Sequence, residues 1–599
     1  MHGHPAPKTR HHRSRYRKFR RAVKKRRGRI VWIAVLVLVV GFGVWFAYSA
    51  IVIKRNLQEV AAHLERLETG LKSGDIGTAG YAEQSARKAA ADAVNASRSI
   101  PWLLVGKVPV LGTPVHAVSE IASVAQRMTE DVIPPALTAL QPHTKVLTGR
   151  SIDLGPVVAA APSLDASLGQ AEAAAFAAQQ IGSGGYLTPV TDARDRLQRV
   201  TAQIVDGLRS AYTAANLAPA MLGQNGPRSY LLAFQTNAEV RGTGGLVGGV
   251  GIVRVSNGSI TVDHIASNVV LRNDLEPMDL GADFTNSYGR YDSTRNWENS
   301  NISPNFPYAG EIWRNLWRQQ TGETVDGTIA VDPVALSYLL DATGPITMGD
   351  GEVIDSKNVV ALTESTAYAR FGADVMARKK YLVDVAYKVV EKLTASTNGD
   401  AILSALTHAV REGRIALWSA HPDEQARIAS TSVGHSVPKT PGPYAAVVVN
   451  NSGASKLDYY IQKKISYHGG GCAGATRRTE VSADFTNMAP GGNLPAYVLG
   501  EDTNVPPGTN KMMVSLYATA GATLLSATAD GRPLPVQSGT ELGHPIYTVL
   551  IDVPPQRSVD VQYTLSEPTV DGTPEAPVQP YVAPASVTVD LPACRGSGQ

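Results

Sequence analysis

The chain has 599 residues, too many for one hydrophobic core, so its length indicates three or four folded units. Its net charge of +4 is misleading, because the first 29 residues hold 13 of the 56 Lys and Arg residues and no acidic residue. The other 570 residues carry 43 basic and 52 acidic side chains, a net charge of −9, which argues against nucleic-acid binding by the folded part.

Residues 30–53 follow this basic segment (1–29) and contain no charged residue. A bilayer core about 30 Å thick needs ~20 apolar helical residues, so the stretch predicts a transmembrane helix. A cleaved signal peptide is the alternative, but its apolar region would be only ~7–15 residues long. Trp32, Trp45 and Tyr48 are typical of interfacial anchors. The basic side of a span stays in the cytoplasm, so we expect a single-pass plasma-membrane protein with its bulk outside the cytoplasm.

Residues 54–222 are rich in alanine and predict a helical stalk or bundle. Leucine and valine recur there with the 3-4 spacing of an amphipathic helix. These positions are Leu57, Val60, Leu64, Leu67 and Leu71, and near the far end Leu197, Val200, Ile204 and Leu208. Residues 101–114 and 133–135 contain prolines that we expect to interrupt the helices. No pattern of catalytic residues is present, so the expected role is spacing and packing.

Residues 223–440 predict an α/β domain, because strand-like and helix-like patterns alternate along them. Short apolar runs predict strands at 230–234 and 325–330. Asn257-Gly258 predicts a hairpin between 246–255 and 259–265. Helices are expected at 311–319 and from Pro333 onward.

Residues 441–599 contain Val-, Thr- and Tyr-rich runs separated by Gly and Pro, which predicts a β-sandwich. A proline-rich connection, 568–584, leads to a last strand expected at 586–591. The only two cysteines are Cys472 and Cys594, and oxidising surroundings favour a disulfide between them. Two separate thiols are the alternative, and zinc is disfavoured because no CxxC motif or nearby His cluster exists.

Two polar segments are candidates for chemistry, since serine-hydrolase elbows, zinc helices and Walker loops are absent. The first is the glycine-rich loop 237–245 with Glu239 and Arg241, and the second is 369–380. Arginine clusters suit phosphate, because a guanidinium binds two oxygens at once. Structural alternatives exist for both segments. Glu239 and Arg241 can form an ion pair that holds the loop, and Asp374 can cap a helix with Arg378 as its i+4 partner.

The segments YLLAFQTNAEVRGTGGLVGGVGIVRVSNGSI and VDGTIAVDPVALSYLLDATGPI resemble the bacterial family known as domain of unknown function 4012. This resemblance covers roughly 225–400 and implies no established activity. The order of strands, arginine-bearing loops and helices is more distantly similar to the LytR-CpsA-Psr family. Members of that family are membrane-anchored enzymes that transfer glycopolymers from polyprenyl-diphosphate carriers to peptidoglycan, with arginines on the pyrophosphate and Mg²⁺ on aspartates.

The LytR-CpsA-Psr resemblance implies roles for individual residues. The catalytic set would be Arg241, Arg272 and Asp274, with Asp274 also holding Mg²⁺. The substrate-binding set would be Glu239, Arg370, Arg378 and Lys379. The sequence departs from the family pattern in three ways: Gly242 and Thr243 follow Arg241 in place of an acid, Gly372 replaces a further arginine, and Lys379 stands where glutamine is expected. Glu239 is the substitute candidate for the missing acid.

The sequence therefore favours a cell-envelope protein that binds, and as an enzyme would transfer, a polyprenyl-diphosphate-linked or phosphorylated glycan. Its expected partners are the membrane, such a glycan and cell-wall polymer. The alternative is a non-catalytic envelope scaffold. A glycan hydrolase would need paired carboxylates, and Asp279, Asp283 and Asp292 are expected to be solvated loop acids. The lipid-binding hypothesis requires Arg241, Arg272, Arg370 and Arg378 to converge in one cavity.

Overall fold

The computed structural model describes residues 12–592 apart from 74–75, 140–146, 149, 183, 440–441, 473, 491–493 and 501–503. The chain forms two compact units. A helical unit comprises Met1–Gln141 and Ala159–Ala214, and a second unit comprises Pro142–Val158 and Ala215–Gln599. The predicted order of a long apolar helix, a helical region and a β-rich C-terminal region is confirmed.

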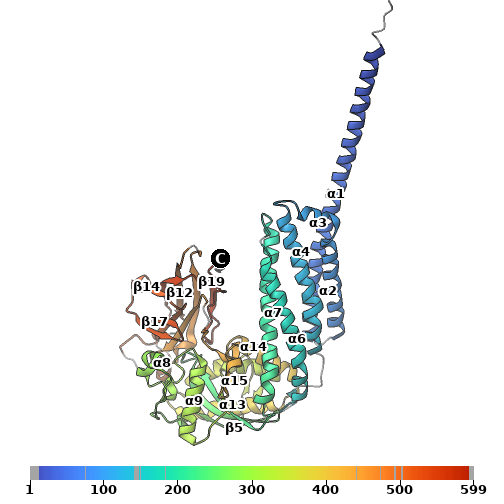
Figure 1. The fold of residues 1–599 in the computed structure, drawn as a ribbon. Coiled ribbons are helices and arrows are strands. Elements are labelled where there is room, and N and C mark those ends of the chain that lie inside the picture. The colour runs from blue at the N-terminus through green and yellow to red at the C-terminus, as the bar shows by residue number, and fades with distance from the viewer. Residues whose placement is uncertain are drawn as a thin grey trace, which may run out of the picture. The chain divides into compact units, whose positions relative to one another are not determined.

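The helical unit begins with α1 (His12–Ser73), a single helix of 62 residues that joins the basic segment to the predicted stalk. Residues Trp32–Leu67 of α1 are long and apolar enough to cross a membrane, and little of their most apolar stretch is buried. The helices that follow are α2 (Ile76–Ser97), α3 (Ile100–Gly106), α4 (Gly112–Arg127), α5 (Ile133–Ala139), α6 (Leu154–Gln180) and α7 (Thr188–Met221). Of these, the long ones α2, α4, α6 and α7 run alongside one another (Figure 1).

The predicted leucine stripe packs α1 against α2. Val60 lies against Ala89 and Ala90, and Leu67 lies against Ala79 and Ala82. Alanine lets the two helix backbones approach closely, so the stripe and the alanines of α2 together explain the pairing. Leu71 lies outside the described side chains.

The two predicted helix interruptions behave differently. Residues 107–111 separate α3 from α4, as expected. In contrast, the prolines at 133–135 do not stop the helix, because a π-helical turn (Met128–Val132) leads directly into α5. Pro134 and Pro135 directly follow this π-helical turn, and prolines and π-bulges are typical places where a continuous helix bends.

The second unit contains a seven-stranded mixed sheet with the order β1-β2-β5-β4-β3-β6-β9. Its central strands β3 and β6 are parallel, and β4 and β9 flank them antiparallel. Asn257 and Gly258 both have positive φ, so the predicted hairpin between β4 and β5 is confirmed. The strands are β1 (Leu147–Thr148), β2 (Ser151–Ile152), β3 (Arg228–Thr236), β4 (Leu246–Ser256), β5 (Ser259–Ser267), β6 (Gly327–Val331) and β9 (Ile415–Ser419).

Helices pack around this sheet, and a side chain caps the start of three of them, α10, α13 and α14. α10 starts at Pro333, as predicted, and its N-cap Asp332 accepts a hydrogen bond from the Ala335 N–H. The helix expected at 311–319 extends further, as α9 (Phe306–Thr321). The other helices are α8 (Ala282–Tyr288), α10 (Pro333–Thr343), α11 (Val359–Ala361), α12 (Ala367–Phe371), α13 (Val375–Ala395), α14 (Gly399–Arg411) and α15 (Pro422–Ile428). A two-stranded sheet, β7 (Ile346–Thr347) and β8 (Val353–Ile354), follows α10.

The C-terminal region consists of a four-stranded sheet, β10-β13-β17-β16, and a six-stranded sheet, β15-β14-β18-β12-β11-β19. Every residue of β10 is buried, because its two faces contact different partners. Ala445, Val447 and Val449 share a core with the six-stranded sheet. Ala446 and Val448 share a core with the helices of the α/β part. The four-stranded sheet is therefore an inner layer of this unit.

The Val-, Thr- and Tyr-rich runs of this region form strands of these two sheets, as expected. The strands are β10 (Ala445–Asn451), β11 (Ile461–Gly469), β12 (Thr476–Asn487), β13 (Asn510–Ala518), β14 (Thr523–Ala529), β15 (Arg532–Pro533), β16 (Gln537–Glu541), β17 (His544–Val553), β18 (Ser558–Pro568) and β19 (Ser586–Asp590). Cys472 lies just after β11, with its Sγ 3.8 Å from the Pro592 carbonyl oxygen. Cys594 lies outside the described residues, so the Cys472–Cys594 disulfide stays a prediction.

Gly310 provides a test of how α9 packs on the sheet. A Cβ at this position would lie 2.6 Å from the Trp418 Cβ and 2.8 Å from the Thr328 Oγ1. We expect Gly310→Ala to lower the free energy of unfolding by about 1–3 kcal/mol through overpacking. Gly349→Ala is the control, because a Cβ there meets nothing within 4 Å. Thermal unfolding of both variants checks this, and equal melting temperatures would contradict the packing.

Candidate functional site

A cavity of about 1160 Å³ lies at the carboxyl ends of the parallel strands β3 and β6. In open α/β sheets this edge is the usual place for a ligand. Strand ends, α10, η5 (Leu362–Thr366) and α13 form its walls, and loops of the C-terminal region close it. Most of its wall is apolar. The apolar side chains include Phe234, Leu246, Ile265, Val331, Leu336, Val375, Leu382, Val383 and Val385.

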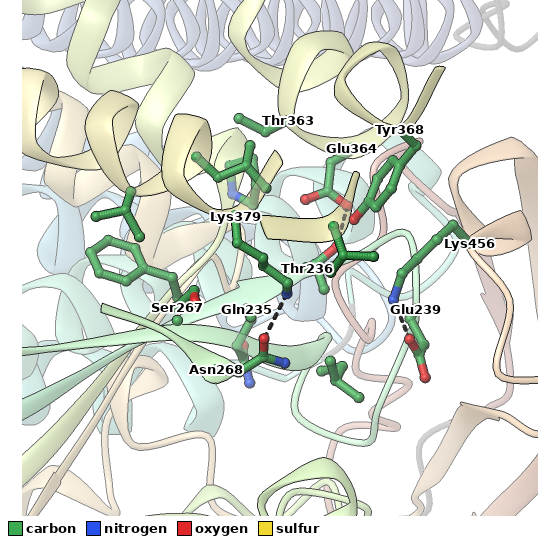
Figure 2. A pocket seen from close by; sticks show the side chains of 18 of the residues that line it. Gln235, Thr236, Glu239, Ser267, Asn268, Thr363, Glu364, Tyr368, Lys379 and Lys456 are labelled. Atoms are coloured by element: carbon green, nitrogen blue, oxygen red, sulfur yellow. Dashed lines mark hydrogen bonds and ion pairs between the residues drawn. The ribbon is translucent and has the colours of Figure 1, made fainter. Parts of the chain in front are cut away.

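Polar side chains gather in one part of this cavity, as Figure 2 shows. Lys379 reaches toward Asn268, and its Nζ donates to the Asn268 Oδ1 at 2.6 Å. Lys456 reaches the carboxylate of Glu239. Glu364 lies beside Tyr368 in the same view. The cavity therefore combines a long apolar wall with a charged end.

Glu239 sits between two cations in this charged end. Its Oε1 accepts from the Arg241 Nη2 at 3.0 Å, and its Oε2 accepts from the Lys456 Nζ. Burial raises the pKa of Glu239, but Lys456 and Arg241 outweigh burial and hold the pKa below its ordinary value. Glu239 is therefore ionised, and both of its oxygens are occupied.

Each of the three side-chain nitrogens of Arg241 donates to an acceptor within the protein. Its Nε donates to the Glu298 carbonyl at 2.9 Å, and its Nη1 donates to the Val240 carbonyl at 3.0 Å. The side chain is buried together with its Glu239 partner. Arg241 thus holds the glycine-rich loop, and the ion pair of the structural interpretation is present.

Arg378 is fully buried and differs from Arg241 in having no hydrogen-bond partner among the described residues for any of its three side-chain nitrogens. Its guanidinium carbon lies 4.0 Å from the centre of the Tyr497 ring and 4.8 Å from that of Tyr368. Both rings line the cavity. Asp374 caps α13 through the Ala377 N–H, as expected, but Arg378 does not form the i+4 pair with it. A buried guanidinium with free donors is an electrostatic site for an anion.

Lys379 and Glu364 have shifted pKa values because both are withdrawn from water. Burial, then the positive charges of Lys456 and Arg378, lowers the pKa of Lys379 to about 8. Burial raises the pKa of Glu364 to about 7, although its Oε2 accepts from the Thr236 hydroxyl at 2.8 Å and the Ala238 N–H at 2.6 Å. Around neutral pH the cavity end is therefore net positive.

Three of the predicted site residues lie elsewhere and have other partners. Arg272 is exposed, and Asp274 pairs with Arg295 on the surface. Arg370 forms a two-point ion pair with Glu352, with N–O distances of 2.9 and 2.6 Å. Among the described residues that line the cavity, Glu239 and Lys379 are from the predicted set, and Arg378 lies directly behind the two tyrosines.

The residues expected to hold Mg²⁺ do not fit that ion. Asp274 is a single, largely exposed carboxylate already paired with Arg295. Both carboxylate oxygens of Glu239, the substitute candidate, are already paired with Arg241 and Lys456. Nowhere in the described part of the chain do three or more His, Cys, Asp or Glu side chains form a metal-binding group. These residues therefore do not support a reaction step that uses magnesium.

The sequence reasoning missed Lys456, Tyr497, Glu364 and Tyr368. Lys456 and Tyr497 come from the C-terminal region, more than 200 residues after the loop they face, and no local pattern marks them. Glu364 and Tyr368 carried a signal, because their i,i+4 spacing places them on one helical face just before Arg370.

Residues 225–368 match the family model described as "Protein of unknown function (DUF4012)". This segment is thus similar to the DUF4012 family. The predicted resemblance is therefore confirmed, and the matched segment is shorter than the expected 225–400. The DUF4012 segment supplies the strand ends, Glu239, Glu364 and Tyr368, whereas Arg378, Lys379 and Lys456 follow it. No curated protein and no solved structure matches the chain.

Two acid-to-amide substitutions test the structural role of Glu239. Glu239→Gln leaves Arg241 and Lys456 as buried, uncompensated cations, so we expect it to destabilise the protein by about 3–5 kcal/mol. Asp274→Asn removes an exposed ion pair and should cost less than about 1 kcal/mol. Chemical denaturation followed by tryptophan fluorescence measures both. Equal effects would show that Glu239 does not compensate these cations.

Proposed function

We propose that this protein is a membrane-anchored, extracytoplasmic cell-envelope protein that binds an amphiphile with a long hydrocarbon chain and a phosphate head. In this proposal α1 crosses the plasma membrane with its basic end in the cytoplasm. The ligand class is a polyprenyl-phosphate or polyprenyl-diphosphate carrier, with or without its glycan. The LytR-CpsA-Psr resemblance supports this class, and the proposal includes an α/β fold of that type and a C-terminal β-sandwich.

The observation that carries the proposal is the pairing of an apolar cavity with uncompensated positive charge. Ligand cavities commonly measure about 300–1,000 Å³, so one of about 1160 Å³ accommodates a ligand larger than a drug-sized molecule. Its wall of Leu, Val, Ile and Phe side chains offers hydrocarbon contacts to a chain.

The charged end of the cavity supports a phosphate head. Glu239 compensates one of the two cations it touches, and Arg378 and Lys379 add positive charge without forming an ion pair with any carboxylate of the described site. Burying a neutral donor without an acceptor costs ~1–3 kcal/mol of stability, and burying a charged donor without one costs more. Phosphate oxygens would accept from Lys379, and the buried positive charge of Arg378 behind Tyr368 and Tyr497 would add electrostatic attraction.

Binding receives more support than transfer. The resemblance assigns catalysis to Arg241, Arg272 and Asp274, but Arg241 is saturated by protein contacts and the other two are exposed. Binding without transfer also suits the scaffold alternative, in which the lipid would tether the protein to envelope polymer.

Matched ligands test the proposal. Geranyl phosphate and geraniol share a hydrocarbon chain and differ in the phosphate. Isothermal titration calorimetry on the full chain in lipid nanodiscs should detect tighter binding of geranyl phosphate. Lys379→Gln should weaken it about 10- to 100-fold, the worth of one hydrogen bond to a charged group. Arg378→Gln should weaken it as well, because it removes a buried positive charge beside the cavity, and both variants should leave geraniol binding unchanged.

Arg272→Gln and Arg370→Gln are the controls, because these arginines have other surroundings. Both should bind geranyl phosphate like the wild type, with or without EDTA. Loss of binding in the controls but not in the Arg378 and Lys379 variants would place the site where the LytR-CpsA-Psr resemblance put it. Absence of binding to either ligand would favour the scaffold without lipid.

The pH dependence of phosphate binding follows from Lys379 and Glu364. Lys379 is cationic below its pKa of about 8 and neutral above it, and Glu364 becomes anionic above its pKa of about 7. Both changes disfavour an anion, so affinity for geranyl phosphate should fall as the pH rises from about 7 to about 9. Lys379→Arg keeps its charge and should flatten the upper part of the decline. An identical decline in this variant would exclude Lys379 as its cause.

A further inference from the structure

One end of the helical unit carries a cluster of exposed apolar side chains. They come from α3 and the turn that follows it, the segment in which prolines interrupt the helices. Their exposed fractions lie between 42% and 70%. The cluster consists of Ile100, Leu103, Leu104, Val108, Val110 and Leu111.

The opposite face of α3 is fixed to the rest of the unit. Trp102 is buried, stacks on Phe46 of α1 with ring centres 5.2 Å apart, and donates from its Nε1 to the Ser119 Oγ at 2.8 Å. It packs with Ile53 and Val115. The helix therefore has a distinct inner face, and its leucines point outward because the inner face is already occupied.

The turn after α3 holds its apolar side chains rigidly. The Gly112 N–H donates to the Val108 carbonyl at 2.8 Å, and His116 Nε2 lies 2.9 Å from the Gly106 carbonyl oxygen. Val110 has a φ of 71°, a left-handed conformation that a β-branched residue rarely adopts. Glycine or asparagine would relieve that strain, so the valine points to a use for its exposed apolar side chain.

The position of this cluster along α1 indicates its partner. Phe46 and Ser49 of α1 contact Trp102 and Ser99, and beyond them toward residue 32 α1 leaves the other helices (Figure 1). From residue 30 to residue 48 a helix is about 28 Å long, close to the ~30 Å of a bilayer core. Ile53 is buried against Trp102, so the end of the predicted 30–53 stretch is covered by protein.

A second loop adds to the same end of the unit. Gly185 lies beside Thr113 and Pro114, at the start of α4. Its neighbours Tyr186 and Leu187 are exposed. Arg98 and Lys107, at the two ends of α3, are exposed as well. Tyrosine and basic residues around an apolar surface are typical of segments that lie in the headgroup region of a bilayer.

We propose that α3, residues 107–111 and the loop 185–187 form a membrane-interface platform that inserts into the leaflet where α1 emerges. This inference rests on the proposed anchoring by α1. The bilayer is the occupant because the apolar surface is continuous with α1 at the end of its uncharged stretch. The platform fixes the bilayer boundary near Ser49. It gives the helical unit a second attachment to the membrane beside α1 and so orients the unit at the membrane surface.

Photo-crosslinking of the full chain tests the platform. p-Benzoylphenylalanine replaces Leu104 or Val110 in protein reconstituted into vesicles of phosphatidylcholine and phosphatidylglycerol, and mass spectrometry identifies the adducts. Tyr81 is the matched control, because it is 70% exposed on α2 but lies about 24 Å from Ser97, the end of that helix next to α3. Leu38 of α1 reports on anchoring. These positions are exposed, so the probes should leave the fold intact, which circular dichroism verifies.

The platform predicts lipid adducts at Leu104 and Val110 in yields similar to Leu38 and several-fold above Tyr81. Lipid adducts at Leu38 but not at Leu104 or Val110 would overturn the platform and leave the anchor standing. Absence of lipid adducts at Leu38 would overturn the anchor itself. Adducts from Leu104 to a second copy of the chain would show that this surface is a protein interface instead.

Discussion

The ionised Glu239 and the two cations that flank it form the interaction on which the second unit depends. Arg241 and Glu239 come from one glycine-rich loop, and Lys456 comes from the C-terminal β region. Three charges removed from water are tolerable only when their hydrogen bonds are satisfied, so the loop and the β region have to meet in one geometry. Asp458 reinforces this contact by accepting from the Val240 N–H at 2.9 Å.

The charge of the cavity follows from this arrangement. Because Glu239 is fully committed to Arg241 and Lys456, it offers nothing to Arg378, whose guanidinium packs against the Tyr497 and Tyr368 rings and has no hydrogen-bond partner among the described residues. Cation–π contact offsets part of the cost of burying a guanidinium and leaves its positive charge without an ion-pair partner beside the cavity. Lys379 and its lowered pKa belong to the same electrostatic environment. An anion with an apolar tail is the ligand that satisfies both parts of the cavity.

Local patterns in the sequence predicted much of the fold. The stripe of Val60 and Leu67, the Asn257-Gly258 hairpin and the cap of Asp374 depend on neighbours within a few residues, so their physics is readable from the chain. The site was predicted in part, because Glu239 and Lys379 line the cavity and Arg378 contacts two of its tyrosine rings. Motif order could not show that Arg295 pairs with Asp274 or that Glu352 pairs with Arg370. Lys456 and Tyr497 could not be predicted from the sequence, since only the packing of the β region against the α/β part places them at the cavity.

Native mass spectrometry of the full chain released from its own membranes tests the central claim most directly. The account predicts a bound species that fragments to phosphate and a long hydrocarbon. It should be lost from an Arg378→Gln/Lys379→Gln double variant and kept by an Arg272→Gln/Arg370→Gln double variant. A chain that carries no lipid, carries only neutral lipid, or retains the phosphate-bearing species without both Arg378 and Lys379 would contradict the account.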